Sequence, residues 1–199
     1  GIMNLAGALS HPAILPKVPV TYLGPLSRFK KRDVESKYDL CIILSGPEPQ
    51  RTIFEKIILQ DLNKAEGKVC LVRAPRPKTE VPRLNKSSNK NKNHLAAEEL
   101  NNVMLQSKII ISRCGYSTVM DLVNLQKKAI LIPTPGQTEQ EYLGGYLQEQ
   151  KIFYGVDQNS FSLPEVLKSA AAFEFNTASF TVNDYENVVE NFVATLRHQ

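Results

Sequence analysis

Small and hydroxyl-bearing residues gather at positions 112–118, where an apolar run of strand length gives way to a stretch with helical spacing. Gly115 would let the backbone approach a ligand closely, and the hydroxyls of Ser117 and Thr118 can bind phosphate oxygens. The unpaired amides and the dipole of a helix N-terminus favour such an anion. A capping pair, Thr118 with Asp121, explains this loop alone equally well.

A second loop of this kind follows the apolar run at 40–44. It contains Ser45 and Gly46 and leads into a stretch with helical spacing, so it is also a candidate site for an anion. Pro47 and Pro49 have no amide hydrogen, and this loop therefore offers fewer donors than the first.

The third loop covers residues 133–140 and contains Gly136 and Gln137. Thr138 and Glu141 have the spacing of a capping box, which would leave the side chains of the intervening residues free in the first helical turn. These intervening residues are Glu139 and Gln140. A purely structural role is again a sound alternative for this loop.

The elements that would position these loops alternate along the chain. Apolar runs predict strands at 40–44, 68–73, 95–97, 109–112, 129–132 and 153–156, and a short strand and turn at 22–29. Helical spacing predicts helices near 53–63, 98–106, 117–126, 138–150, 163–173 and 183–196.

Strands that alternate with helices through short connections specify a parallel sheet covered on both faces. We therefore expect an α/β, Rossmann-like, three-layer domain with a mostly parallel sheet of about six strands and helices on both faces. Ligands of such sheets bind outside the carboxyl ends of the strands. All three loops should open on that edge.

The chain of 199 residues, 42% of them hydrophobic, is suited to one domain. Residues 1–21 are broken by Pro12, Pro16 and Pro19 and are expected to be a connector from a preceding domain, with the Rossmann-like domain at 22–199. No apolar stretch reaches the ~18 residues of a membrane helix, and no secretory signal is apparent. We therefore expect a cytoplasmic protein with no transmembrane segment.

The cysteines and histidines show no spacing typical of a metal site, a disulfide framework or a catalytic triad. The sequence therefore predicts no metal and no cofactor. Cys41 and Cys70 lie within apolar runs and are expected in the core.

The net charge of +4 comes from one loop. Residues 73–94 contain seven lysines and arginines but only one acid, Glu80. The favoured interpretation is a solvated, flexible insertion. A lid in which Arg73 or Arg76 meets a diphosphate is the alternative, and no aromatic residues interleave with the charges as nucleic-acid binding would require.

Residues 111–147, ISRCGYSTVMDLVNLQKKAILIPTPGQTEQEYLGGYL, resemble the signature of a glycosyltransferase family. The block is similar to the C-terminal domain of the bacterial N-acetylglucosaminyltransferase that completes lipid II, and to its GT-B relatives. That superfamily pairs two Rossmann-like domains across a cleft and holds the nucleotide-sugar donor mainly on the second.

The resemblance implies a role for each matching residue. Gly115, Ser117 and Thr118 would face the diphosphate and the uracil side, Asp121 would accept hydrogen bonds from the ribose hydroxyls, and Gln140 would bind the donor sugar. The remaining residues expected at the donor site are Ser45, Gly46, Arg113, Tyr116, Gly136, Gln137, Glu139 and Glu141. For Arg113, a surface or salt-bridge role is the alternative.

This sequence departs from the lipid II enzyme at several positions. Asp121 stands for a longer Glu, Glu141 for a second Gln, and Gly144-Gly145 for Asn-Ala, while the loop at 45–50 replaces a glycine-rich loop. The sugar and the acceptor can therefore differ.

The resemblance implies an inverting, metal-independent transfer of a hexosyl group from a UDP-sugar to an acceptor hydroxyl, with N-acetylglucosamine as one candidate sugar. The acceptor and the catalytic base would belong to the absent N-terminal domain, the fragment alone would be inactive, and the whole protein could associate peripherally with a membrane. Two alternatives remain open: a nucleotide-sugar hydrolase or epimerase of the same fold, and a non-catalytic binding module or scaffold.

Overall fold

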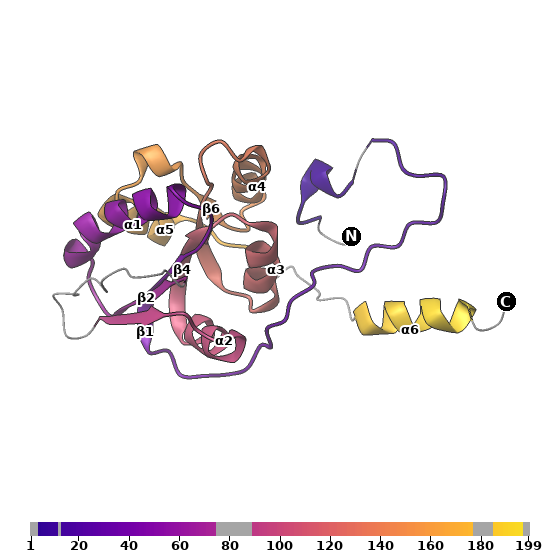
Figure 1. Ribbon diagram of the computed structural model, residues 1–199, viewed down its shortest axis with the longest axis horizontal. Coiled ribbons are helices and arrows are strands. Elements are labelled where there is room, and N and C mark those ends of the chain that lie inside the picture. Colours follow the sequence, from indigo (N-terminus) through magenta and orange to yellow (C-terminus); the bar gives the residue numbers. More distant parts are fainter. Residues whose placement is uncertain (1–3, 12, 75–88, 177–184, 197–199) are drawn as a thin grey trace.

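A six-stranded, fully parallel sheet forms the centre of the protein (Figure 1). The computed structural model describes residues 4–11, 13–74, 89–176 and 185–196. The strands are β1 (Tyr38–Leu44), β2 (Val69–Arg73), β3 (Lys90–Asn93), β4 (Ser107–Arg113), β5 (Lys128–Ile132) and β6 (Tyr154–Gly155). Their order, β3-β2-β1-β4-β5-β6, is that of the Rossmann fold, with the reversal of strand order between β1 and β4.

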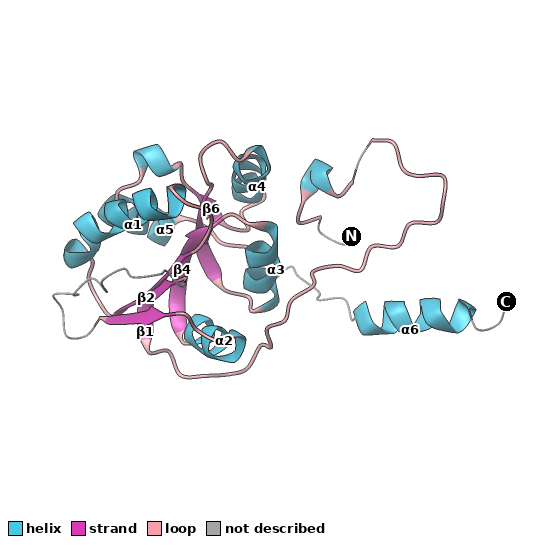
Figure 2. Cartoon of the chain, in the orientation of Figure 1, coloured by secondary structure: helices cyan, strands magenta, loops and turns pink. Residues whose placement is uncertain are grey.

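Helices cover both faces of the sheet, as Figure 2 shows. Residues of α2 (Ala97–Leu105), α3 (Tyr116–Asn124) and α4 (Thr138–Glu149) form one core cluster with residues such as Cys41 and Cys70. Residues of α1 (Gln50–Asp61) and α5 (Leu163–Ala172) form the other with Leu40 and Ile42. Successive strand residues point to opposite faces, so each apolar strand supplies both clusters. The predicted three-layer fold is therefore confirmed, and Cys41 and Cys70 lie in the core as expected.

Three short 3-10 helices complete the described elements: η1 (Gly7–Leu9), η2 (Leu62–Lys64) and η3 (Gln158–Ser160). Residues 4–9 pack back onto α4, where Tyr146 donates a hydrogen bond to the carbonyl of Asn4 (2.7 Å) and the amide of Ala8 donates to the Tyr142 hydroxyl (2.8 Å). Leu5 and Ala6 are buried there as part of the same core cluster as Leu143 and Leu147 of α4.

Two predicted strands were wrong. Residues 95–97 lead into α2, and the third strand is instead the polar segment Lys90–Asn93, which pairs with β2 alone. An edge strand needs main-chain hydrogen bonds but few apolar side chains, so the apolar pattern missed it. Residues 22–29 form no strand and run as an extended segment across α2 and α3.

The last helix, α6 (Tyr185–Leu196), has the predicted apolar face, with Val189, Phe192 and Val193 exposed. It was predicted to begin at 183, which lies outside the described residues. The predicted flexible insertion also falls largely outside them, at 75–88, whereas its end forms β3.

Helix α4 approaches the loop after β5 very closely at Gly144. A Cβ atom built on Gly144 would lie 2.7 Å from Cγ of Pro133, closer than real contacts allow. The neighbouring Gly145 has no heavy atom within 4 Å of such a Cβ. The two glycines therefore offer a matched pair of sites on one helix.

We expect Gly144→Ala to lower the free energy of unfolding by about 1–3 kcal/mol, because the added methyl group overpacks the contact with Pro133. Gly145→Ala should be neutral or stabilising by up to about 1 kcal/mol, since alanine favours the helix. Urea denaturation measures both. Equal stability of the two variants would contradict the close packing of α4 on this loop.

Candidate functional site

The three loops predicted to carry chemistry follow β1, β4 and β5, which are neighbours in the sheet. Because the strands are parallel, all three loops open at the carboxyl edge, on both sides of the reversal between β1 and β4. The expectation that the loops share one edge is correct.

A cavity of about 450 Å³ lies at the reversal point, and this volume is in the usual range of ligand pockets. Four of the predicted residues line it: Ser45 after β1, and Ser117, Thr118 and Asp121 on α3. The apolar part of the wall comes from the segment before β1, from β1 and from α2: Leu26, Phe29, Ile43, Leu100 and Met104. One charged residue that the sequence did not single out, Arg28, completes the lining.

The N-terminus of α3 presents backbone amides to this region. The helix begins at Tyr116 with Gly115 as its N-cap, and no side chain in the described part of the protein caps it. The capping pair of Thr118 with Asp121 is therefore wrong, because the Asp121 carboxylate accepts a hydrogen bond from Ser27 instead. Unpaired amides and the positive end of the helix dipole make this terminus suitable for an anion.

The Asp121 carboxylate is half-buried at the cavity and accepts a hydrogen bond from the Ser27 hydroxyl, with Oγ 2.6 Å from Oδ1. Burial raises the pKa of this carboxyl above its ordinary value of 3.8, and the Ser27 hydrogen bond and the nearby Arg28 charge oppose the rise. Asp121 is thus a hydrogen-bond acceptor held by the protein at the wall of a largely apolar cavity.

The loop after β1 was expected to bind an anion, but a carboxylate of the protein already occupies the start of the helix that follows it. The carboxylate of Glu48 accepts hydrogen bonds from the amide and the hydroxyl of Thr52, at 3.2 and 2.6 Å, in the first turn of α1. These bonds, with Arg51, lower the pKa of Glu48 to about 2. The protein's own carboxylate therefore takes the place that an anionic ligand would have at this helix, and Ser45 is the loop's contribution to the cavity. Gly46 is exposed with a φ of 101°, which favours glycine.

The loop after β5 is braced by its own side chains. Gln140 accepts a hydrogen bond from the amide of Thr134 (3.0 Å) and donates one to Gln137, while Glu141 accepts one from the amide of Gly136 (2.9 Å). The expected capping box of Thr138 with Glu141 is wrong, because Gln137 is the N-cap and no side chain caps it. None of these residues lines the cavity at the reversal point.

Two further predicted residues flank these loops. Tyr116 is half-buried, packs on the core, and has its pKa raised by burial. Glu139 is exposed, and its charge adds to the burial that raises the pKa of the Cys114 thiol to about 12. Glu139 therefore lies near the loop after β4.

Arg113 does not face the cavity but joins the three loops from inside the protein. Its Nη2 donates to the carbonyl of Gln50 (2.9 Å) and to Oε1 of Gln158 (2.6 Å), and its Nη1 donates to the carbonyls of Ile132 and Pro133 at 3.4 and 3.3 Å. The guanidinium also stacks over Phe54, 4.5 Å from the ring centroid. Burial lowers its pKa to about 10, so it stays charged at neutral pH. Arg113 therefore has a structural role, and its contact with a donor stays a prediction.

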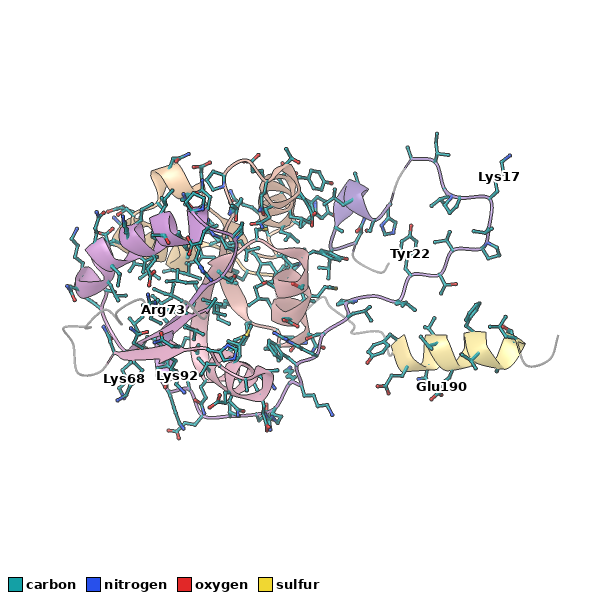
Figure 3. All side chains as sticks on the ribbon, viewed as in Figure 1. Lys17, Tyr22, Lys68, Arg73, Lys92 and Glu190 are labelled. Carbon is teal, nitrogen blue, oxygen red and sulfur yellow. The ribbon has the colours of Figure 1, made fainter. Side chains whose placement is uncertain are left out.

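Arg73, considered above as a diphosphate contact, is also used internally. It forms an ion pair with Glu55, and both side chains are buried. Figure 3 shows Arg73 within the body of the domain, whereas Lys17 lies on the extended segment and Glu190 on α6. Arg76, the other residue of that alternative, lies outside the described residues.

Ser27 and Arg28 were missed because their segment was predicted to be a strand and turn. No local pattern marks them. Ser27 reaches Asp121, and Arg28 reaches the cavity, only because Phe29 is buried against the core and carries the segment over α3. Among the residues described, no group of three His, Cys, Asp or Glu side chains could hold a metal ion, and no helix is both long and apolar enough to cross a membrane.

Comparison with known proteins now identifies the family. Residues 41–192 match the glycosyltransferase family 28 C-terminal domain. The chain belongs to this family. A search of curated proteins found no match.

Solved structures of glycosyltransferases share the fold of this family 28 domain. The glycosyltransferase SnogD from Streptomyces nogalater is 11% identical with a TM-score of 0.50, over 89% of this chain and 46% of its own. The glycosyltransferase of kitacinnamycin is 12% identical with a TM-score of 0.52, over 79% of this chain and 39% of its own. The spinosyn rhamnosyltransferase SpnG, solved with thymidine diphosphate, is 16% identical with a TM-score of 0.51, over 84% and 49%. The chain thus spans less than half of the length of each.

The internal position of Arg113 leads to a prediction on stability. Arg113→Leu should lower the free energy of unfolding by about 2–4 kcal/mol, because it removes the donor to several carbonyl oxygens and to the buried Oε1 of Gln158. Arg32→Ala, which removes an exposed hydrogen bond to Asn102, should change it by less than about 0.5 kcal/mol. Thermal or urea unfolding compares the two. A neutral Arg113→Leu would show that the three loops do not depend on this guanidinium.

Proposed function

We propose that this chain is the donor-binding domain of a glycosyltransferase that transfers a hexosyl group from a UDP-sugar to an acceptor hydroxyl. The observation that carries the proposal is the cavity at the reversal of strand order, where an uncapped helix N-terminus, three hydroxyls, a carboxylate and an arginine meet. Membership of glycosyltransferase family 28 supports the same function.

The diphosphate would bind at the N-terminus of α3. The amides of the first turn are directed outward from the helix, and the hydroxyls of Ser117 and Thr118 add donors beside them. Arg28 supplies the positive charge that we had expected from Arg113, since its guanidinium is exposed at the cavity wall.

The ribose would bind at Asp121. Ser27 occupies one position on Oδ1, which leaves Oδ2 and the second lone pair of Oδ1 for the hydroxyls of a sugar. Both ribose hydroxyls can donate to a carboxylate, and a partly buried carboxylate forms stronger hydrogen bonds than an exposed one.

The transferred sugar would lie toward the loop after β5. Gln140 donates one of its two amide hydrogens to Gln137, so the other is available to a sugar hydroxyl. The hydrogen bonds of Gln140 and Glu141 to their own loop hold this surface in one conformation, which lowers the entropy lost on binding. Glu139 remains exposed beside them.

In the proposed reaction, an acceptor hydroxyl attacks the anomeric carbon, the bond from that carbon to the diphosphate oxygen breaks, and a base removes the hydroxyl proton. The configuration is inverted, and no metal takes part. This domain would stabilise the negative charge that develops on the leaving diphosphate. The base and the acceptor site would belong to a preceding domain. The whole protein would be cytoplasmic and would contact a membrane peripherally.

Calorimetric titration tests donor binding. UDP and UDP-N-acetylglucosamine should bind with micromolar to millimolar dissociation constants, whereas no binding would favour a scaffold. Thymidine diphosphate, titrated in the same way, is the comparison nucleotide. In a protein that includes the preceding domain, release of nucleoside diphosphate should require an acceptor, and release without one would favour a hydrolase.

Asp121→Asn should weaken UDP binding by about ten- to a hundredfold, because an amide replaces the charged acceptor of the ribose hydroxyls. Asp33→Asn, at an exposed position of the lead-in segment (residues 22–37, before β1), should bind UDP as the unchanged protein does. Titration calorimetry at neutral pH measures both. Equal affinities of the two variants would refute the role of Asp121.

The pH dependence of UDP binding provides a separate prediction. The carboxylate must be ionised to accept both hydrogen bonds, so UDP affinity should be full above the Asp121 pKa and fall as the pH drops through it. Burial raises this pKa above 3.8, so the fall should begin at a higher pH than for an exposed aspartate. The Asp121→Asn variant should lack this component, and an identical pH profile in both proteins would contradict the assignment.

A further inference from the structure

The segment before β1 contributes a side chain to the donor site. The hydroxyl of Ser27 donates to Oδ1 of Asp121, with 2.6 Å between the oxygens, although the two residues are 94 positions apart in the chain. The same hydroxyl oxygen accepts a hydrogen bond from the amide of Phe29 at 3.0 Å. A serine hydroxyl has one hydrogen, so the bond from Phe29 leaves that hydrogen directed at the carboxylate.

We propose that Ser27 is a positioning residue, which holds the Asp121 carboxylate in the orientation that receives the two ribose hydroxyls and thereby sets the preference for ribose over deoxyribose. This inference rests on the proposed function of Asp121 as the ribose acceptor. Ser27 would act through Asp121 and would make no contact with the transferred sugar.

Ser27 can position another residue because the two residues that follow Arg28 are anchored to two helices. Phe29 is buried in the core, and its carbonyl accepts a hydrogen bond from the side chain of Asn124 on α3 (2.7 Å). The carbonyl of Lys30 accepts one from Asn101 on α2 (3.1 Å). The hydroxyl is therefore fixed relative to the helix that carries Asp121, and a rotation of the carboxylate would break its bond to Ser27.

The chemistry of the cavity wall makes this hydrogen bond consequential. A half-buried carboxylate has lost part of its hydration, and a donor from the protein replaces that loss for the ionised form. Around Asp121, α2 presents Leu100 and Met104, the end of β1 presents Ile43 and Ser45, and α3 presents Ser117 and Thr118, none of which titrates near neutral pH. Arg28 is the other charged residue among the described residues that line the cavity.

A double-mutant cycle on the full 199-residue chain tests the inference, with UDP and 2′-deoxy-UDP as the probes in titration calorimetry. Ser27→Ala should weaken UDP binding by about three- to tenfold and should reduce the ratio of the 2′-deoxy-UDP to UDP dissociation constants. In the Asp121→Asn background, Ser27→Ala should have no further effect on UDP, because Ser27 acts through the carboxylate.

Two variants separate positioning from general damage. Ser27→Thr keeps the hydroxyl and should restore UDP binding and the preference for ribose. Ser36→Ala removes a hydroxyl of the same lead-in segment that contacts the carbonyl of Gln106, and it should match the unchanged protein. The hydrogen bond from Ser27 stabilises the ionised form of Asp121, so its removal in Ser27→Ala should raise the Asp121 pKa. The midpoint of the pH dependence of UDP binding should therefore move to a higher pH.

The outcomes distinguish this inference from the proposed function. If Asp121→Asn weakens UDP binding but Ser27→Ala does not, or if Ser27→Ala weakens it equally in both backgrounds, the positioning role is wrong and the ribose site stands. If UDP does not bind, or if it binds Asp121→Asn as tightly as the unchanged protein, the proposed function fails, and the role of Ser27 fails with it.

Discussion

The parallel pairing of β1 with β4 is the constraint on which the site depends. Pairs such as Leu40 with Ile109 and Ile43 with Ser112 align the two strands, so that both end at the same edge. Because the chain continues outward from β1 toward β2 and from β4 toward β5, the connections diverge at this point and leave a space between them. The cavity occupies that space, and a different strand order would not create it.

The strand ends are joined by one buried guanidinium. Arg113 bonds to carbonyl oxygens of the α1 start and of the loop after β5, and it lies at the end of β4 itself. A planar group with five hydrogens can serve several carbonyls at once, which a lysine could not do with this geometry. The electrostatic cost of burying the charge is therefore offset by four hydrogen bonds from the two terminal nitrogens and by the face of Phe54.

The polar groups of the site divide into those that are already bonded and those that remain available. Glu48, Gln140 and Glu141 hold their own loops, so these loops keep their shape without a ligand. The α3 terminus has no side-chain cap. Among the residues that the structure describes, Ser27 is the donor to the carboxylate of Asp121. A rigid frame around a few available donors and acceptors is the arrangement expected of a preorganised binding site.

The sequence by itself determined the layered α/β architecture, because apolar runs of strand length alternate with amphipathic stretches, and this pattern has few solutions. It also indicated the three loops, since the carboxyl ends of parallel strands share one edge. It did not reveal β3, whose polar edge position needs no apolar pattern, or the internal role of Arg113, whose partners lie on three separate loops. Only the tertiary structure decided that Ser27 and Arg28 reach Asp121, because this contact depends on how a segment without regular structure packs across α2 and α3.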